Sequence, residues 1–61
     1  MDLYQKVIHP TSGTGFVYML DRTCYTANHS PDNPWVTIKL DLGGTTKGEL
    51  NTLLQDGWKV A

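Results

Sequence analysis

Cysteine is nearly absent from this chain of 61 residues, and its scarcity limits how the fold can be stabilised. Cys24 is the only cysteine, so an internal disulfide is excluded. A chain of this size buries only about 60% of the surface that its unfolded form exposes, and its core barely offsets the conformational entropy lost on folding. We therefore expect a partner protein or a second copy of the chain to contribute stability.

Closely spaced metal ligands are also lacking. Zinc sites take their ligands in short pairs such as Cys-x2-Cys or His-x3-His. The candidate ligands of this chain form no such pair; they are His9, Cys24, His29 and Asp32. The sequence therefore predicts neither a bound metal nor another cofactor.

Neither sign of charge is in large excess. Five basic residues stand against six acidic ones, which gives a net charge of -1 and a pI near 6.0. The basic residues are spread singly along the chain, at Lys6, Arg22, Lys39, Lys47 and Lys59. Proteins that bind nucleic acid through its phosphates cluster their lysines and arginines. The composition therefore argues against nucleic acid as a partner.

Long apolar runs are missing too. The longest, Phe16–Leu20, is far shorter than the roughly 20 residues that cross a membrane as a helix. Residues 1–4 lack the basic and apolar regions of a signal peptide. With one free cysteine and no export signal, we expect a cytoplasmic protein that does not enter a membrane.

Spacings typical of catalysis are absent as well. Ser12, Cys24 and Ser30 are candidate nucleophiles, but none stands at a recognisable spacing from a histidine. A domain this small rarely encloses a pocket of about 300 Å³ or more. We therefore predict that the protein is not an enzyme.

The residues that are present favour a small sheet. Leu3–Ile8 contains Tyr, Val and Ile and predicts a first strand. His9-Pro10 ends it, because proline lacks the N–H that strand pairing requires. Residues 11–15 contain two glycines, which permit positive φ, and predict a turn.

A second strand, Phe16–Asp21, is apolar on both of its faces. One face is expected to carry Phe16, Tyr18 and Leu20, and the other Val17 and Met19. Such a strand is either covered on both sides or presents one apolar face to a partner. Because one short helix cannot cover both faces, this strand predicts an interaction surface.

The clearest alternation in the chain follows a loop. Residues 22–27 either extend the second strand or bend, and residues 28–34 predict a loop from their Asn, Asp and Pro content. A third strand then alternates between a core face and a solvent face. Val36, Ile38, Leu40 and Leu42 are expected to face the core, and Trp35, Thr37, Lys39 and Asp41 to face solvent. Gly43-Gly44 ends this strand.

The C-terminal part predicts a helix over Thr46–Gln55. Thr46 and Glu49 fit a capping box, in which the threonine oxygen accepts a hydrogen bond from the N–H of the third helical residue. Leu50, Leu53 and Leu54 form one narrow apolar stripe.

Beyond the helix, Gly57 suits the left-handed backbone position that follows a helix end. Trp58 is expected in the core, where its ring can cover the leucine stripe, and Trp58–Val60 predicts a closing strand. The order is strand-strand-strand-helix-strand in a single domain, residues 1–61. It predicts an α+β fold with one helix on one face of a mostly antiparallel sheet. The alternative is a small SH3-like barrel with the helix as a plug.

Both ends of the chain resemble a known type of domain. The ending Leu50–Val60, with its leucine helix followed by Gly-Trp-x-Val, resembles small uncharacterised bacterial and phage domains. Those domains often open with a Tyr-x-Tyr-Lys-Val-Val strand, to which Tyr4–Ile8 is similar with one tyrosine kept. The resemblance covers roughly the first eight and last twelve residues. It implies a helix packed across a sheet, Trp58 wedged between them, and frequent self-association, but no agreed activity.

These observations predict a non-enzymatic protein-interaction module. The resemblance to phage domains suggests that it is a phage-encoded regulator or inhibitor of a host protein. A homodimer is a further expectation. An exposed tryptophan is a typical interface anchor, and Trp35 lies on the solvent face of the third strand. The predicted partner-binding residues are Trp35, Tyr18, Met19 and Lys39.

The alternative function is small-ligand or nucleotide binding by the 11–15 turn and the 28–34 loop. Successive backbone N–H groups in a glycine-rich turn can hold an anion. The residues of this alternative are Ser12, Gly13, Thr14, Gly15 and His29. The turn leads into a strand and lacks the phosphate-binding Gly-x4-Gly-Lys framework, so an ordinary hairpin turn is the favoured interpretation.

Overall fold

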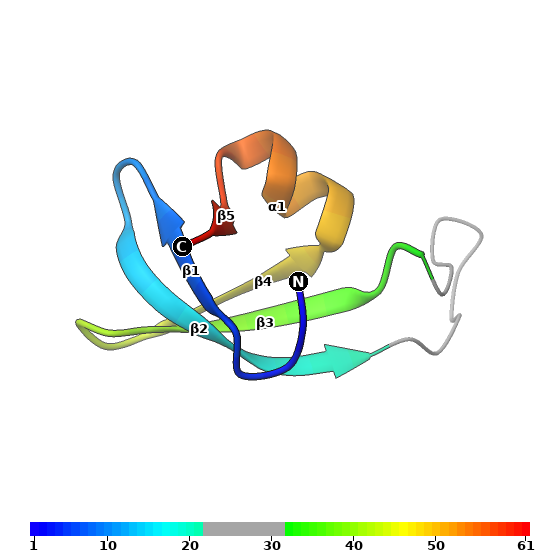
Figure 1. The fold of residues 1–61 in the computed structure, drawn as a ribbon, viewed down its shortest axis with the longest axis horizontal. Coiled ribbons are helices and arrows are strands. Elements are labelled where there is room, and N and C mark those ends of the chain that lie inside the picture. The colour runs from blue at the N-terminus through cyan, green and yellow to red at the C-terminus, as the bar shows by residue number, and fades with distance from the viewer. Residues whose placement is uncertain (22–31) are drawn as a thin grey trace.

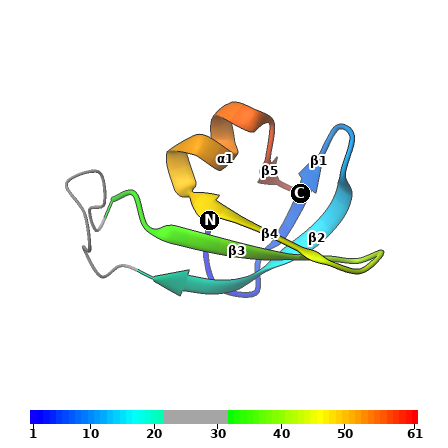
Figure 2. The ribbon, with the colours of Figure 1, turned by 180° about the vertical axis from the view of Figure 1, so that it is seen from behind.

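The computed structural model describes residues 1–21 and 32–61, which form five strands and one helix (Figure 1). In chain order they are β1 (Lys6–His9), β2 (Gly13–Asp21), β3 (Trp35–Leu40), β4 (Thr45–Glu49), α1 (Leu50–Asp56) and β5 (Lys59–Val60). The strands pair antiparallel in the order β4-β3-β2-β1-β5. The sheet curves, and α1 lies over one of its faces between the two edge strands (Figures 1 and 2).

This arrangement confirms the predicted α+β fold, with one helix near the C-terminus on one face of an antiparallel sheet. A closed barrel would require β4 to pair with β5. The strand pairings of the described residues stop at these two strands, so the sheet is open and the SH3-like alternative is wrong.

The core lies between the sheet and α1. Its buried apolar side chains are Val7, Val17, Val36, Ile38, Leu53 and Trp58. They come from β1, β2, β3 and α1 and from the residue before β5, so each layer contributes. Trp58 is 3% exposed, which confirms its predicted place in the core.

The alternation predicted for the second strand is interrupted by a β-bulge. The register between β2 and β3 shifts between Val17 and Met19, where two residues of β2 oppose one of β3. An extra residue moves every later side chain to the opposite face. Val17 and Leu20 therefore pack in the core, while Tyr18 and Met19 are both exposed. Placing Leu20 with Tyr18, and Met19 with Val17, was wrong for this reason.

The predicted capping box is also wrong, because Thr46 and Glu49 belong to a strand. Gly43 has φ 108°, its N–H donates to the Leu40 carbonyl, and the Leu40 N–H donates to the Gly44 carbonyl. These bonds form a tight hairpin that returns residues 45–49 along β3. Leu42, expected to face the core, lies in the hairpin loop and is 96% exposed.

The helix is consequently shorter than predicted, and its N-terminus is capped from a distant segment. Glu49 occupies the N-cap position, but its side chain forms no capping hydrogen bond with the first turn of α1. Instead the Leu50 N–H donates to the Pro34 carbonyl, and the Asn51 N–H donates to the Asn33 side-chain oxygen. These contacts satisfy donors that a helix N-terminus leaves open.

The helix end agrees with the prediction. Gly57 has φ 119°, its N–H donates to the Leu54 carbonyl, and the Trp58 N–H donates to the Leu53 carbonyl. This pair of bonds is the Schellman motif, which needs a left-handed residue just past the helix. The predicted leucine stripe holds only in part, because Leu54 is 47% exposed.

The remaining predicted elements shift by a few residues. The first strand begins at Lys6 rather than Leu3 and includes His9, and the last strand is Lys59–Val60. Residues 22–31 lie outside the described part of the chain. They include the predicted extension over 22–27 and His29 of the predicted loop.

Candidate functional site

The face of the sheet turned away from α1 carries the residues predicted to bind a partner. The register between β2 and β3 brings residues of this face together in pairs. Phe16 lies opposite Lys39, Met19 opposite Thr37, and Asp21 opposite Trp35. Lys6 of β1 and Lys47 of β4 extend the same rows, opposite Phe16 and Thr37. We call this surface the outer face. It includes Lys6, Phe16, Tyr18, Met19, Asp21, Trp35, Lys39, Lys47 and Glu49.

Apolar groups on the outer face are open to solvent. Tyr18 is 48% exposed, Met19 54% and Trp35 37%. Met19 lies opposite Thr37, and Trp35 is two residues away from Thr37 along β3. Met19 and Trp35 are therefore diagonal neighbours, at a spacing that a large ring can bridge. The bulge places Tyr18 and Met19 on this face together. A group of neighbouring exposed apolar side chains on a sheet face is typical of an interaction surface.

Two ring contacts lie at the centre of the outer face. The Phe16 and Tyr18 rings meet edge to face, with centroids 6.4 Å apart. The Lys39 ammonium lies 5.7 Å from the centroid of the Tyr18 ring, a cation–π geometry. The structure thus brings together two of the predicted residues, Tyr18 and Lys39, and adds Phe16.

Charge is unevenly distributed over the outer face. Lys6, Lys39 and Lys47 are exposed around the Phe16–Tyr18 pair. Asp21 and Glu49 flank Trp35, each opposite it on a neighbouring strand. Among the described residues, lysines therefore gather around the centre of the outer face, and two carboxylates lie at its Trp35 end. Sequence reasoning missed this pattern, because lysines scattered along the chain come together only through strand register.

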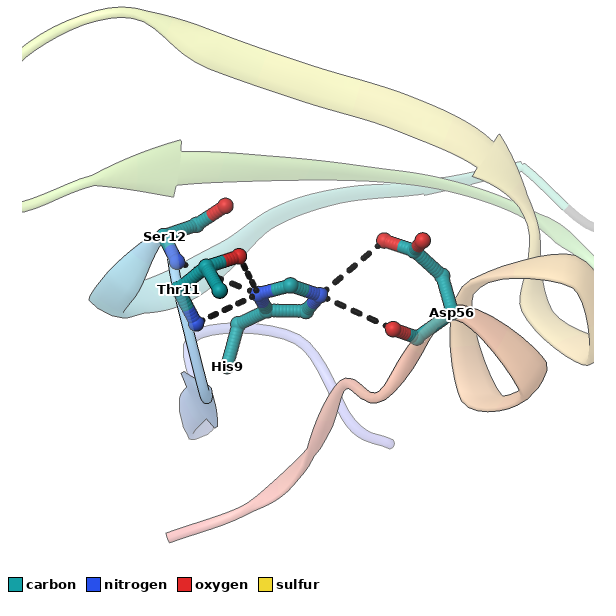
Figure 3. A network of polar contacts seen from close by, with 4 residues as sticks. All are labelled: His9, Thr11, Ser12 and Asp56. Atoms are coloured by element: carbon teal, nitrogen blue, oxygen red, sulfur yellow. Dashed lines mark hydrogen bonds and ion pairs between the residues drawn. The ribbon is translucent and has the colours of Figure 1, made fainter.

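A cluster of polar contacts surrounds His9, which is 9% exposed (Figure 3). The Nδ1 atom of His9 accepts hydrogen bonds from the N–H groups of Thr11 and Ser12, at 3.2 and 3.1 Å, and lies 3.1 Å from the Thr11 hydroxyl. Its Nε2 atom lies 2.9 Å from the carbonyl oxygen and 3.1 Å from the carboxylate of Asp56. Two backbone donors point at Nδ1, and this geometry favours the tautomer that carries its proton on Nε2 and donates it to Asp56.

The His9 cluster ties the β1–β2 turn to the C-terminal end of α1. The ring also lies 5.0 Å from the Trp58 ring, so it packs on the core. Both ring nitrogens are engaged, and the described residues enclose no pocket beside them. We assign the cluster a structural role. In the sequence, only the His-Pro pair at a strand end marks it.

The residues predicted to bind a small ligand in the 11–15 turn are part of the β1–β2 hairpin. The Ser12 N–H donates to His9, and Gly13 pairs with His9 at the start of β2. Thr14 donates its hydroxyl to Asp41, and Gly15 is buried against β3. His29 lies outside the described residues, so the proposed meeting of the 11–15 turn with the 28–34 loop stays a prediction.

Residues 1–21 and 32–61 include two of the four candidate metal ligands, His9 and Asp32. Within these ranges, no three His, Cys, Asp or Glu side chains come together in a way that could hold a metal ion. Two of the four candidate ligands named above, Cys24 and His29, fall outside them. Over the same part of the chain, no helix has the length and hydropathy needed to span a membrane.

Comparison of the chain with protein-family models, with curated proteins and with solved structures finds no match. The resemblance to small bacterial and phage domains therefore stays a prediction.

Proposed function

We propose that this chain is a non-enzymatic protein-interaction module that docks a partner protein on the outer face of its sheet. The observation that carries the proposal is the placement of Tyr18 and Met19. Both are about half exposed, on the part of β2 that lies beyond its pairing with β1 and runs along β3 alone. A bulge that turns two consecutive large side chains to solvent leaves apolar area unburied, which only a docked partner would remove from water.

The surroundings of these residues support docking. Trp and Tyr are the residue types most enriched among those that dominate binding energy, and Trp35 adds a second large ring beside Met19. Phe16 and Lys39 hold Tyr18 by ring contacts, so little side-chain entropy would be lost when a partner binds. The partner is proposed to be a protein in the cytoplasm. The resemblance to phage domains alone suggests that this partner is a host protein, regulated or inhibited by a phage-encoded chain.

Site-specific photo-crosslinking in cells tests the proposal. A photoreactive phenylalanine analogue would replace Met19 on the outer face or, as a matched control, Leu54 on α1, which is 47% exposed. We expect a discrete crosslinked adduct from position 19 and none from position 54. Equal adducts from both positions, or none from position 19, would contradict the proposal.

The mass of the adduct separates the partners. A heavier protein joined at position 19 supports a foreign partner. An adduct of twice the mass of the chain, absent in the Tyr18→Ser variant, identifies a second copy as the occupant and overturns the choice of a foreign protein.

A further inference from the structure

The lysines of the outer face lie around its aromatic centre. Lys6 and Lys39 both stand opposite Phe16, on β1 and β3, and neither strand is at an edge of the sheet. Lysines on edge strands prevent unwanted pairing between sheets. That role accounts for Lys47 on β4 but not for Lys6 or Lys39.

These lysines have no ionic partner within the described residues. None of Lys6, Lys39 and Lys47 forms an ion pair with a carboxylate there. The Cα atoms of Lys6 and Lys39 flank Phe16 from neighbouring strands and are therefore about 10 Å apart. Lys47 is diagonal to Lys39 and about 7–8 Å from it. A negative group placed among the three would be attracted by each of them.

The position of Lys39 places charge and apolar surface side by side. Its ammonium lies 5.7 Å from the centroid of the Tyr18 ring, at the solvent-exposed surface. A carboxylate of a bound protein segment that reached Lys39 would therefore lie against the Phe16–Tyr18 pair. The residues next to that carboxylate in the segment would then lie over Met19 and Trp35. From this juxtaposition we infer that the outer face binds a protein segment in which acidic side chains stand next to apolar ones. The inference rests on the proposed function and names the chemistry of its partner.

A single-stranded nucleic acid fits the same surface less well. Stacking of bases needs free ring faces, whereas the Phe16 and Tyr18 rings contact each other and Lys39 lies over Tyr18. The chain as a whole is also slightly acidic, with a net charge of -1.

Selection from a displayed library of random 12-residue peptides tests the inference. The full chain and its Lys39→Glu variant would be used as baits in parallel. We expect peptides enriched by the wild-type chain to combine Asp or Glu with large apolar residues. Their affinity should fall roughly tenfold or more for Lys39→Glu, and it should weaken with added salt. Lys59→Glu is the control, because it makes the same change of charge opposite Ile8 on β5, two strands from Tyr18, and should lower the affinity less than Lys39→Glu does.

The outcomes separate this inference from the proposed function. Enriched peptides that need Tyr18 and Met19 but carry no acidic excess would leave the proposed function standing and overturn the inference. Failure to enrich any peptide that depends on Tyr18 or Met19 would count against both. If a 12-nucleotide oligo-dT bound more tightly than the selected peptides and lost binding in Lys39→Glu, the partner class would be wrong.

Discussion

The side-chain oxygen of Asn33 accepts a hydrogen bond from the backbone N–H of Asn51 at 2.9 Å, across 18 positions of the chain. Asn33 is 8% exposed, and its side-chain amide also donates to the Glu49 carboxylate at 3.1 Å. This long-range cap fixes the start of α1 and the entry to β3 at the same time. It therefore couples the helix that covers the core to the strand that carries Trp35.

Replacing Asn33 by alanine removes this cap. We expect the free energy of unfolding to fall by about 1–2 kcal/mol, because a helix N–H loses its acceptor and the Glu49 carboxylate loses a donor. Urea denaturation followed by tryptophan fluorescence measures the change. Asn51→Ala is the control, since Asn51 contributes its backbone N–H and the side chain is exposed. An Asn33→Ala variant as stable as the wild type would show that the bond does not cap the helix.

The His9 ring should hold its proton on Nε2. Nitrogen-15 NMR of the imidazole distinguishes the two neutral tautomers, and the His9→Phe variant assigns the signal to His9 rather than His29. We predict the Nε2–H form, because Nδ1 faces the N–H groups of Thr11 and Ser12. A proton found on Nδ1 would contradict the geometry of the cluster.

The same variant tests what the cluster contributes to stability. His9→Phe keeps a ring against Trp58 but leaves two backbone N–H groups without an acceptor, which costs about 1–3 kcal/mol. Asp56→Asn should cost less than about 1 kcal/mol, since the carboxylate is 64% exposed and the backbone carbonyl still accepts from Nε2. Equal losses in the two variants would mean that the contact with the Asp56 carboxylate, and not the turn, is the important one.

Two glycines in the sheet should respond oppositely to alanine. A Cβ at Gly15 would lie 2.6 Å from the Lys39 carbonyl oxygen, so Gly15→Ala forces β2 and β3 apart and destabilises the fold. A Cβ at Gly48 would meet Leu53 at 3.7 Å, an ordinary contact, and Gly48→Ala should stabilise by about 0.4–1 kcal/mol. Thermal unfolding of the pair checks both. A stable Gly15→Ala variant would place the β2–β3 register in doubt.

How much of this fold the sequence predicts depends on the range of the interactions. The Gly57 helix end and the buried Trp58 follow from local rules and are confirmed. The β4 strand was missed because Thr46 and Glu49 satisfy a capping pattern, while the hairpin that pairs them with β3 depends on contacts beyond the helix window. Asn33 was invisible as a cap because its partner is distant in sequence.

The candidate site shows the same division. Tyr18, Met19, Trp35 and Lys39 were chosen for their residue type and their alternation, and their role in binding stays a prediction. The alternation rule put Tyr18 and Met19 on opposite faces, and only the bulge brings them together. A bulge is a difference in length between two paired strands, so one strand read alone gives no sign of it. The grouping of lysines likewise depends on register across four strands.

Trp35→Ala gives a simpler test of the interface. Trp35 is 37% exposed at the end of the outer face, so we expect weaker binding of the selected peptides with little loss of stability. Circular dichroism and anisotropy on the same samples separate the two effects. A variant that fails to fold would show that Trp35 is structural.

The most direct test of the outer face as a docking surface is an NMR titration of the nitrogen-15-labelled full chain with the tightest selected peptide. The account predicts that the largest amide shift changes fall in residues 16–19 and 35–39, with small changes in Leu50–Asp56. Changes concentrated in α1 or in the 11–15 turn, with the outer face unaffected, would contradict it.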